Sequence, residues 1–502
     1  MTDIAMTIAP HTTQVSADLV AKRYRAERRF RAYGLISLGI TALFLAFLVV
    51  DIVGKGFPAF FEHTVTLPVT VAADKVDAAD PVKGDYGTIA KDALKEAFPA
   101  MSGRTDRKAL LGLLSTGASD DLREKVVADP SLIGKTVEVP LLMSADADLY
   151  FKGTQTGIDR QVGASPIEII QTGDKFAING SFDASSAGTI IRANDGAFRV
   201  KAISGSALEA EVLLQPTSIG KVDAGKWQQL RFSKPEADRR VSDKEAVVLE
   251  TLQERGLVTQ GVAWRFFTSG DSREPELSGI KGALVGSLLT IAITLAISLP
   301  IGIAAAVYLE EFAKKGRMTD LIEVNINNLA AVPSIIFGLL GLAVFLNFFG
   351  MPRSAPLVGG LVLALLVLPT IIIASRAAFR SVPPSIKEAA LGVGASHQQA
   401  VFHHILPLAV PGILTGTILG VARALGETAP LLMIGMVAFI VDVPTGVTDA
   451  ATLLPVQIYL WSDLPELGFQ SRTAAAIILL MFVLFGLNAV AIYLRKRFER
   501  RW

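Results

Sequence analysis

Two opposite charges stand inside an apolar stretch near the C-terminus. Arg423 and Glu427 lie within residues 408–437, which are otherwise mostly apolar or small. A lone charge at the centre of a membrane helix costs about 2.5–3.5 kcal/mol, so such residues face a protein interior or a wet cavity. A guanidinium offers oxyanions a planar fork and stays charged at every relevant pH. The pair predicts an anion pathway, or else an i,i+4 ion pair that only neutralises two charges.

Small residues on the same segment indicate which face packs against other helices. Gly412, Gly416 and Gly420 recur every four residues and form one stripe along a helix. At 100° per residue, Glu427 lies about 20° and Arg423 about 60° from Gly420 around the axis. The sequence therefore predicts one long helix here, with both charges facing a tightly packed bundle.

A polar segment separates two later apolar stretches and cannot cross a membrane. Residues 381–407 read SVPPSIKEAALGVGASHQQAVFHHILP, in which paired prolines precede a helix-forming run. A loop of roughly 30 residues can form a short helix parallel to the membrane and dock in a groove on a soluble partner. A plain polar connector is the alternative interpretation.

Residues in this segment resemble a known family. The segment resembles the EAA loop of ABC importer permeases in the pattern formed by Glu388, Ala389, Ala390, Gly394 and Leu406-Pro407. One position departs from it, because His404 stands where isoleucine is usual. The resemblance implies that an EAA loop at about 376–407 docks on an ATPase subunit. The residues implied as the contact are Glu388, Ala389, Ala390 and Gly394.

The chain lacks the residues for several kinds of chemistry. It contains no cysteine, which excludes disulfides, thiol catalysis and Cys-based metal sites. Its five histidines are mostly scattered, so we expect no bound metal or cofactor. Gly134-Lys135-Thr136 is the nearest approach to a phosphate-binding loop, but Asp129 stands where that loop needs its first glycine. We therefore expect no enzyme activity in this chain, and ATP-Mg on a partner ATPase.

The composition indicates a membrane protein. The 502 residues are 51% hydrophobic, and the mean hydropathy of +0.46 is too high for an ordinary soluble chain. Lys plus Arg (48) nearly balances Asp plus Glu (47), so net charge gives no sign of a nucleic-acid partner. Six apolar segments approach the length that spans a bilayer: 32–50, 282–309, 326–349, 356–374, 408–437 and 473–494.

Basic residues predict the orientation of these spans. They precede the first span at Lys22, Arg23, Arg25, Arg28, Arg29 and Arg31, and follow the last at Arg495, Lys496, Arg497, Arg500 and Arg501. The positive-inside rule then places both termini, 1–31 and 498–502, in the cytoplasm of a bacterium, with the first helix at 32–53 in the inner membrane. By the same rule we expect Arg376 and Arg380 to be anchors at the cytoplasmic surface rather than guides for an anion.

The region 54–277 has the composition of a soluble domain, which the orientation makes periplasmic. Stretches such as KDALKEAF and RKALLGLL have helical periodicity, whereas KTVEVPLL, DKFAING and GAFRVKAISGSALEAEVLL alternate as strands do. These patterns predict an α+β domain. Acid-rich patches such as SADADLYF are expected to be solvated turns. The aromatics of Trp264–Phe267 fit either a helix at the membrane surface or a short core helix.

A second resemblance covers about 279–497. ARALGETAPLL, which contains Arg423 and Glu427, closely resembles the A-type permease subunit of phosphate-specific ABC importers, as do LPIGIAAAVYLEEFA and NNLAAVPSIIFGLLGLAVF. It implies an all-α type I ABC importer permease fold of six transmembrane helices, with its core at 278–497 and an extra α+β extracytoplasmic domain. It also implies a phosphate path lined by Arg423, with Glu427 either holding the arginine or helping the anion to leave.

The implied partners are those of a binding-protein-dependent importer. They are an ABC ATPase dimer, a second permease of the C type, a periplasmic phosphate-binding protein, phosphate and the lipid bilayer. A permease for sulfate, molybdate or phosphonate is the nearest alternative. An extracytoplasmic sensor would need a cytoplasmic output domain, for which the inside segments are too short. An extracytoplasmic enzyme is disfavoured because 54–277 holds one histidine, His63, and no nucleophile motif.

Overall fold

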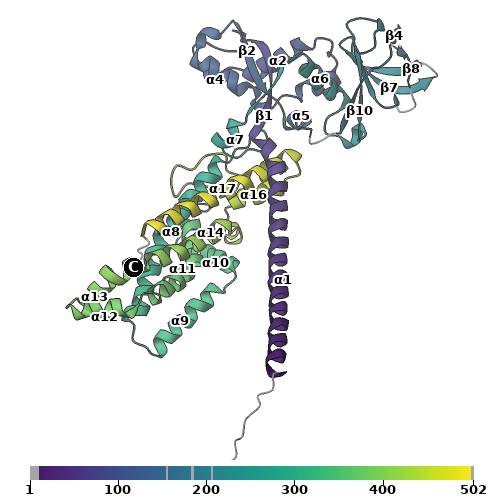
Figure 1. Ribbon diagram of the computed structural model, residues 1–502. Coiled ribbons are helices and arrows are strands. Elements are labelled where there is room, and N and C mark those ends of the chain that lie inside the picture. The colour runs from purple at the N-terminus through teal and green to yellow at the C-terminus, as the bar shows by residue number, and fades with distance from the viewer. Residues whose placement is uncertain (1–10, 154–156, 174, 183–185, 205–206, 499–502) are drawn as a thin grey trace, which may run out of the picture. The chain divides into compact units, whose positions relative to one another are not determined.

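The computed structural model describes residues 11–498 apart from 154–156, 174, 183–185 and 205–206 (Figure 1). Two compact units divide the chain, 1–55 and 56–502. The helix α1 runs without a break over His11–Gly56 and contains the predicted span 32–50. The basic run before that span is helical too, since Lys, Arg, Ala and Glu are good helix formers. Residues 1–10 and 499–502 hold parts of the predicted termini, including Arg500 and Arg501, and lie outside the described residues.

Within the described ranges, five helices are long and apolar enough to cross a membrane, or six if one bent pair counts as a span. Besides α1 they are α8 (Lys281–Val307, continued by a π-turn over Tyr308–Phe312), α11 (Pro356–Arg380), α14 (Leu406–Gly426) and α17 (Leu467–Phe498). A short helix α13 (His397–Ala400) and a π-turn over Val401–Ile405 lead into α14. The prediction of an all-helical membrane core is confirmed.

In the structure the predicted span 326–349 falls on the bent pair. Helix α9 (Arg317–Ala330) and helix α10 (Ser334–Gly341, continued by a π-turn over Leu342–Phe348) meet at an angle of 98°. Pro333 lies in the break between them. Proline donates no backbone hydrogen bond and disfavours the helical conformation of the residue before it, so Pro333 favours the break at this point.

The predicted span 408–437 is also wrong as a single helix. Helix α14 ends at Gly426, Glu427 is extended with φ −81° and ψ 116°, and the five-residue α15 (Ala429–Met433) follows. Pro430 explains the stop, because its ring would clash with the carbonyl of residue 426 and it has no N–H to offer that oxygen. The other helices of this part are α12 (Pro384–Gly392) and α16 (Leu454–Ser462).

Helix α11 lies at the centre of the helical core and packs against both α8 and α14 (Figure 1). The predicted glycine stripe on α14 makes the second contact. A Cβ added to Gly416 would lie 2.1 Å from the Cβ of Ala374, and one added to Gly412 would lie 2.6 Å from that of Ala378. Only glycine at these positions lets the two backbones approach so closely.

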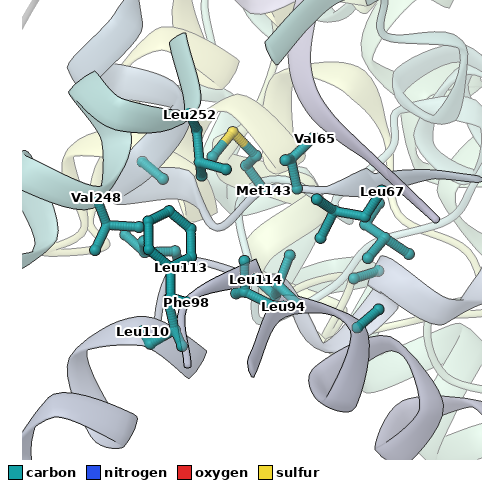
Figure 2. Packing of buried hydrophobic residues seen from close by; sticks show 14 of the residues in the cluster. Val65, Leu67, Leu94, Phe98, Leu110, Leu113, Leu114, Met143, Val248 and Leu252 are labelled. Atoms are coloured by element: carbon teal, nitrogen blue, oxygen red, sulfur yellow. The ribbon is translucent and has the colours of Figure 1, made fainter. Parts of the chain in front are cut away.

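Residues 57–277 form two lobes, which confirms the α+β prediction. In the first lobe, helices cover the antiparallel sheet β11-β1-β2, and the residues labelled in Figure 2 form its apolar core. The strands are β1 (Phe61–Thr70), β2 (Thr136–Leu142) and β11 (Val258–Val262). The helices are α2 (Tyr86–Ala97), α3 (Arg104–Leu111), α4 (Asp120–Ala128), α5 (Ala145–Phe151) and α6 (Asp243–Glu254), with 3₁₀ turns at Phe57–Phe60, Pro81–Lys83, Thr116–Ser119, Pro130–Leu132 and Glu236–Asp238.

The second lobe is an antiparallel sheet with the strand order β3-β10-β6-β7-β8-β5-β4-β9. Its strands are β3 (Ile158–Val162), β4 (Ile167–Thr172), β5 (Lys175–Asn179), β6 (Ile190–Ala193), β7 (Gly196–Ser204), β8 (Ala207–Leu214), β9 (Gly220–Val222) and β10 (Trp227–Phe232). Three arginines of this sheet pair with acids of α6, as Arg160–Glu250, Arg192–Glu254 and Arg199–Asp243. Ion pairs therefore join the lobes.

The aromatic helix α7 (Trp264–Thr268) combines the two alternatives left open by the sequence. Phe266 is fully buried and packs at 5.6 Å from the ring of Phe60 and at 6.4 Å from that of Trp461. Trp264, by contrast, is exposed. The Phe266 side of this short helix thus belongs to a core, and the Trp264 side is exposed.

The acid-rich patch SADADLYF is a buried helix, so the expectation of a solvated turn is wrong. Asp148 on α5 accepts hydrogen bonds from the backbone N–H of His63 at 3.0 Å and from Nδ1 of its ring at 2.8 Å, and pairs with Lys152. Burial would raise the pKa of Asp148, but the His63 hydrogen bond and the Lys152 charge outweigh it and hold the pKa below its ordinary value. The helix is amphipathic, and its acid points into a polar cluster.

Replacing this carboxylate should weaken the first lobe. We expect Asp148→Asn to destabilise it by about 3 kcal/mol, because the ammonium of Lys152 loses its partner in a buried place. Because the folded pKa is depressed, this contribution should be present above the unfolded pKa of about 3.9 and lost as the pH falls through the folded pKa. Amide hydrogen exchange over β1 and α5 of the full chain measures it. The exposed Glu124→Gln is the control, and equal protection in both variants would contradict the expectation.

Contact between α14 and α11 should depend on glycine at 416. We expect Gly416→Ala to lower the stability of the purified chain by about 1–3 kcal/mol, because its methyl group overlaps Ala374. Thermal unfolding in detergent is the measurement. Gly426→Ala, where a methyl group meets nothing within 4 Å, is the matched control. Adding Ala374→Gly should restore stability, and failure to do so would show that the overlap is not the cause.

Candidate functional site

Arg423 and Glu427 lie together where α14 ends. Their Nε and Oε1 atoms are 3.6 Å apart, too far for a hydrogen bond, and their side chains are 41% and 23% exposed. The prediction that both face the packed bundle is therefore wrong. The glycine stripe occupies the packed face, Arg423 extends away from it, and Glu427 stands beyond the helix end. Among the described residues, Glu427 is the one carboxylate within 4 Å of this guanidinium.

A second interrupted helix lies beside this one. Helix α10 packs against α15, and a Cβ added to Gly338 would lie 2.6 Å from the Cα of Pro430. The break before α10 and the break after α14 thus occur in neighbouring segments. In a bilayer, irregular backbone is tolerated only where protein or a water-filled cavity surrounds it, and transporters often bind ions at interrupted helices. Arg423 lies in the last turn before such an interruption, and its 41% exposed side chain can donate to an anion there.

The predicted short helix of the 376–407 segment is α12. Glu388 and Ala389 are exposed on it, whereas Ala390 is buried. Gly394 follows with φ +92°, a left-handed conformation that glycine adopts at little cost and that turns the chain towards α13. Val393 is 86% exposed and Leu391 is also exposed. This end of the core therefore presents a small apolar surface beside one acid, which suits docking against another protein.

Arg376 and Arg380 differ from the prediction of membrane-surface anchors. Arg376 is 9% exposed and is held by Glu310 on Oε1 at 2.6 Å and by Glu323 on Oε2 at 2.8 Å. Arg380 donates to Oε2 of Glu310 at 2.9 Å but is more exposed. The anchor interpretation is wrong for Arg376, because protein carboxylates satisfy its charge.

Sequence reasoning missed Glu310 and Glu323 as the partners of Arg376 and Arg380. Two adjacent acids at the end of the apolar stretch 282–309 were the available signal. Glu310 lies 66 residues from Arg376, so only the fold brings them together. Over the described residues, no three His, Asp or Glu side chains gather as metal ligands would.

Thiol labelling can test the placement of the two arginines, since the chain has no cysteine of its own. We expect Arg423→Cys to react readily with a charged methanethiosulfonate reagent. Arg376→Cys should react about tenfold or more slowly, because reactivity follows exposure. Mass spectrometry of the detergent-purified chain gives both rates. Equal rates would contradict the placement of Arg423 on an accessible surface.

Comparison with protein families divides the chain. Residues 298–502 match a family described as binding-protein-dependent transport system inner membrane component. Residues 17–161 match a family described as a domain of unknown function, DUF3333, which covers most of α1 and the part of the first lobe from β1 to α5, and ends within β3. This part of the first lobe, without α6 and β11, thus recurs in other proteins, although the family description assigns it no role.

Individual relatives match the helical core. The chain is 31% identical over 244 residues to the phosphate transport system permease protein PstA 1 of Mycobacterium tuberculosis strain CDC 1551, covering 49% of this chain and 79% of that protein. It is 30% identical over 232 residues to the phosphate transport system permease protein PstA of Haemophilus influenzae, covering 45% and 81%. Among solved structures, an inward-facing MetNI methionine ABC transporter aligns over 43% of this chain and 97% of that chain, with 18% identity and a TM-score of 0.34.

Proposed function

Because this chain belongs to the PstA family of phosphate transport system permeases, we propose that it is the membrane-spanning subunit of an ATP-driven importer of inorganic phosphate. The observation that carries this proposal is the similarity to PstA proteins across most of their length, at 31% identity over 244 residues. The exposed guanidinium of Arg423 at a helix interruption is chemistry suited to that substrate, since phosphate oxygens accept the planar fork of arginine.

ATP hydrolysis is assigned to a separate ATPase dimer bound at α12. The exposed Glu388, Ala389 and Gly394, with the neighbouring Val393, form the proposed contact. Ala390 is buried, so in the proposed contact it packs α12 against this chain and does not touch the ATPase. Small residues let two backbones approach, and the glutamate can pair with a basic groove.

The proposed assembly has further members. A second, C-type permease would enclose the path with this chain, and a periplasmic phosphate-binding protein would deliver the anion. In this arrangement both termini are cytoplasmic, because the basic residues at 22–31 and 495–501 flank the first and last spans. The two lobes of 57–277 then stand in the periplasm.

Within this path, Arg423 is proposed to bind the passing anion. The long Arg423–Glu427 contact suits a transient site, since Glu427 neutralises the guanidinium without occupying all its donors. A nearby carboxylate also repels phosphate and so helps it to leave. An anion held too tightly would stop transport, which makes a weakened site useful.

Uptake of labelled phosphate at low external concentration tests the proposal, in cells lacking this subunit and complemented with variants. Arg423→Gln should reduce uptake by about 10- to 100-fold, the worth of a charge-assisted hydrogen bond. Glu388→Lys should abolish ATP-driven uptake by disrupting the ATPase contact. The exposed Arg317→Gln and Glu124→Lys are controls of matched charge.

Quantities of each variant in the membrane must equal those of wild type. Full transport by Arg423→Gln would remove this residue from the path. Failure of wild type to restore uptake, with its partner subunits present, would overturn phosphate as the substrate, and competition by sulfate, molybdate and phosphonate would then identify another oxyanion.

A further inference from the structure

The end of α8 carries two adjacent acids that bind different partners. Helix α8 changes to a π-turn at Tyr308–Phe312, a local widening that often occurs at functional positions. Glu310 binds the arginines of α11, as described above. Glu311 binds elsewhere, on the segment that holds α12 and α13.

Glu311 holds both short helices at once. Its Oε2 accepts a hydrogen bond from Nζ of Lys387 on α12 at 2.6 Å, and its backbone oxygen lies 2.8 Å from Nε2 of His397 on α13. A carbonyl can only accept, so Nε2 carries the proton. The ring of His397 also meets Phe312 edge-on, with centroids 5.0 Å apart. We call Glu311, Lys387 and His397 the Glu311 clamp.

An apolar cluster lies next to the clamp and joins the same elements. Ala306 and Val307 at the end of α8 pack with Phe379 of α11 and with Val401 and Ile405 of the π-turn before α14. Polar and apolar contacts thus tie the end of α8 to α12, α13 and the start of α14. The chain itself connects α12 only to α11 and, through α13, to α14. Noncovalent contacts alone connect it to α8.

We propose that the Glu311 clamp makes α8 move with α12, so that Glu311, Lys387 and His397 are positioning residues for transport. This inference rests on the proposed function, in which α12 receives the movement of an ATPase. The Glu311 side chain is 10% exposed. Moving α12 away from α8 would leave this carboxylate without its cation in a place that water scarcely reaches, which is strongly unfavourable. The two helices therefore shift as one body.

Lys387 and Glu388 lie on two different faces of α12. Lys387 turns towards α8 and is 31% exposed, whereas the next residue, Glu388, is exposed towards a partner. Successive residues on a helix point about 100° apart, so one short helix can meet the ATPase and α8 at the same time. A force that the ATPase exerts on the Glu388 face is then transmitted through α12 to α8.

The purified complex in lipid vesicles tests the clamp through two rates, phosphate uptake and ATP hydrolysis. Glu311→Gln and Lys387→Met should each lower the phosphate moved per ATP hydrolysed by about fivefold or more, since losing a buried ion pair loosens α12 from α8. ATP hydrolysis itself should continue. The exchange Glu311→Lys with Lys387→Glu should restore most of the ratio, and exposed Lys314→Gln should leave it unchanged. An exchange variant that assembles but remains uncoupled would overturn the proposal, as would normal coupling in both single variants.

A distance measurement tests the clamp without depending on the transported substrate. Because the chain has no cysteine, Lys315→Cys and Gln398→Cys introduce a single pair of spin-label sites beside α8 and on α13. In the complex we expect their distance to stay the same between nucleotide-free and ATP-trapped states, and to broaden when Glu311→Gln is added. A distance that changes with ATP in the otherwise wild-type chain would refute joint movement. If this distance stays fixed while wild type carries no phosphate, the substrate proposal fails and the clamp stands.

Discussion

Three glycines let the backbone of α14 lie close to α11, directly on the side chains of Ala378, Ala374 and Val367. In a bilayer the lipid tails are as apolar as a helix surface, so helices associate through close van der Waals contact. Adding one methyl group at Gly416 would bring carbon atoms to 2.1 Å. Because α11 also packs on α8, it fixes how both neighbours lie in the core, and with them the positions of Arg423 and of the acids of the π-turn.

Helix contacts of this kind could be predicted from the sequence, whereas the positions of the helix ends could not. The glycine stripe and the apolar runs follow from local composition, and they predicted the membrane core and the packed face of α14. The breaks at Pro333 and Pro430 depend on how much strain neighbouring helices absorb, because proline often occurs inside intact membrane helices. The position of Glu427 followed from such a break and was therefore misjudged. Glu311 and Lys387, 76 residues apart, could be paired only by the fold.

Three acids of the helical core lie where regular helix gives way. Glu310 and Glu311 occupy a π-turn and Glu427 follows the end of α14, whereas Glu323 lies in the middle of α9. At such points some backbone N–H and C=O groups lose their helical hydrogen bonds, and polar side chains compensate for the lost bonds. The residues proposed to bind an anion and those proposed to transmit movement therefore share one structural cause.

The two lobes beside this core are joined in another way. Each sheet has an apolar core, and ion pairs between acids of α6 and arginines of the second sheet connect the lobes, with Glu254 49% exposed in its pair with Arg192. The apolar core of the first lobe also includes Ile190 and Leu230 of the second sheet, so apolar packing crosses the junction as well. Dissolved salt screens exposed pairs far more than it weakens apolar packing. A change in the ionic strength of the surrounding medium thus acts on the exposed pairs of the junction and leaves its apolar contacts in place.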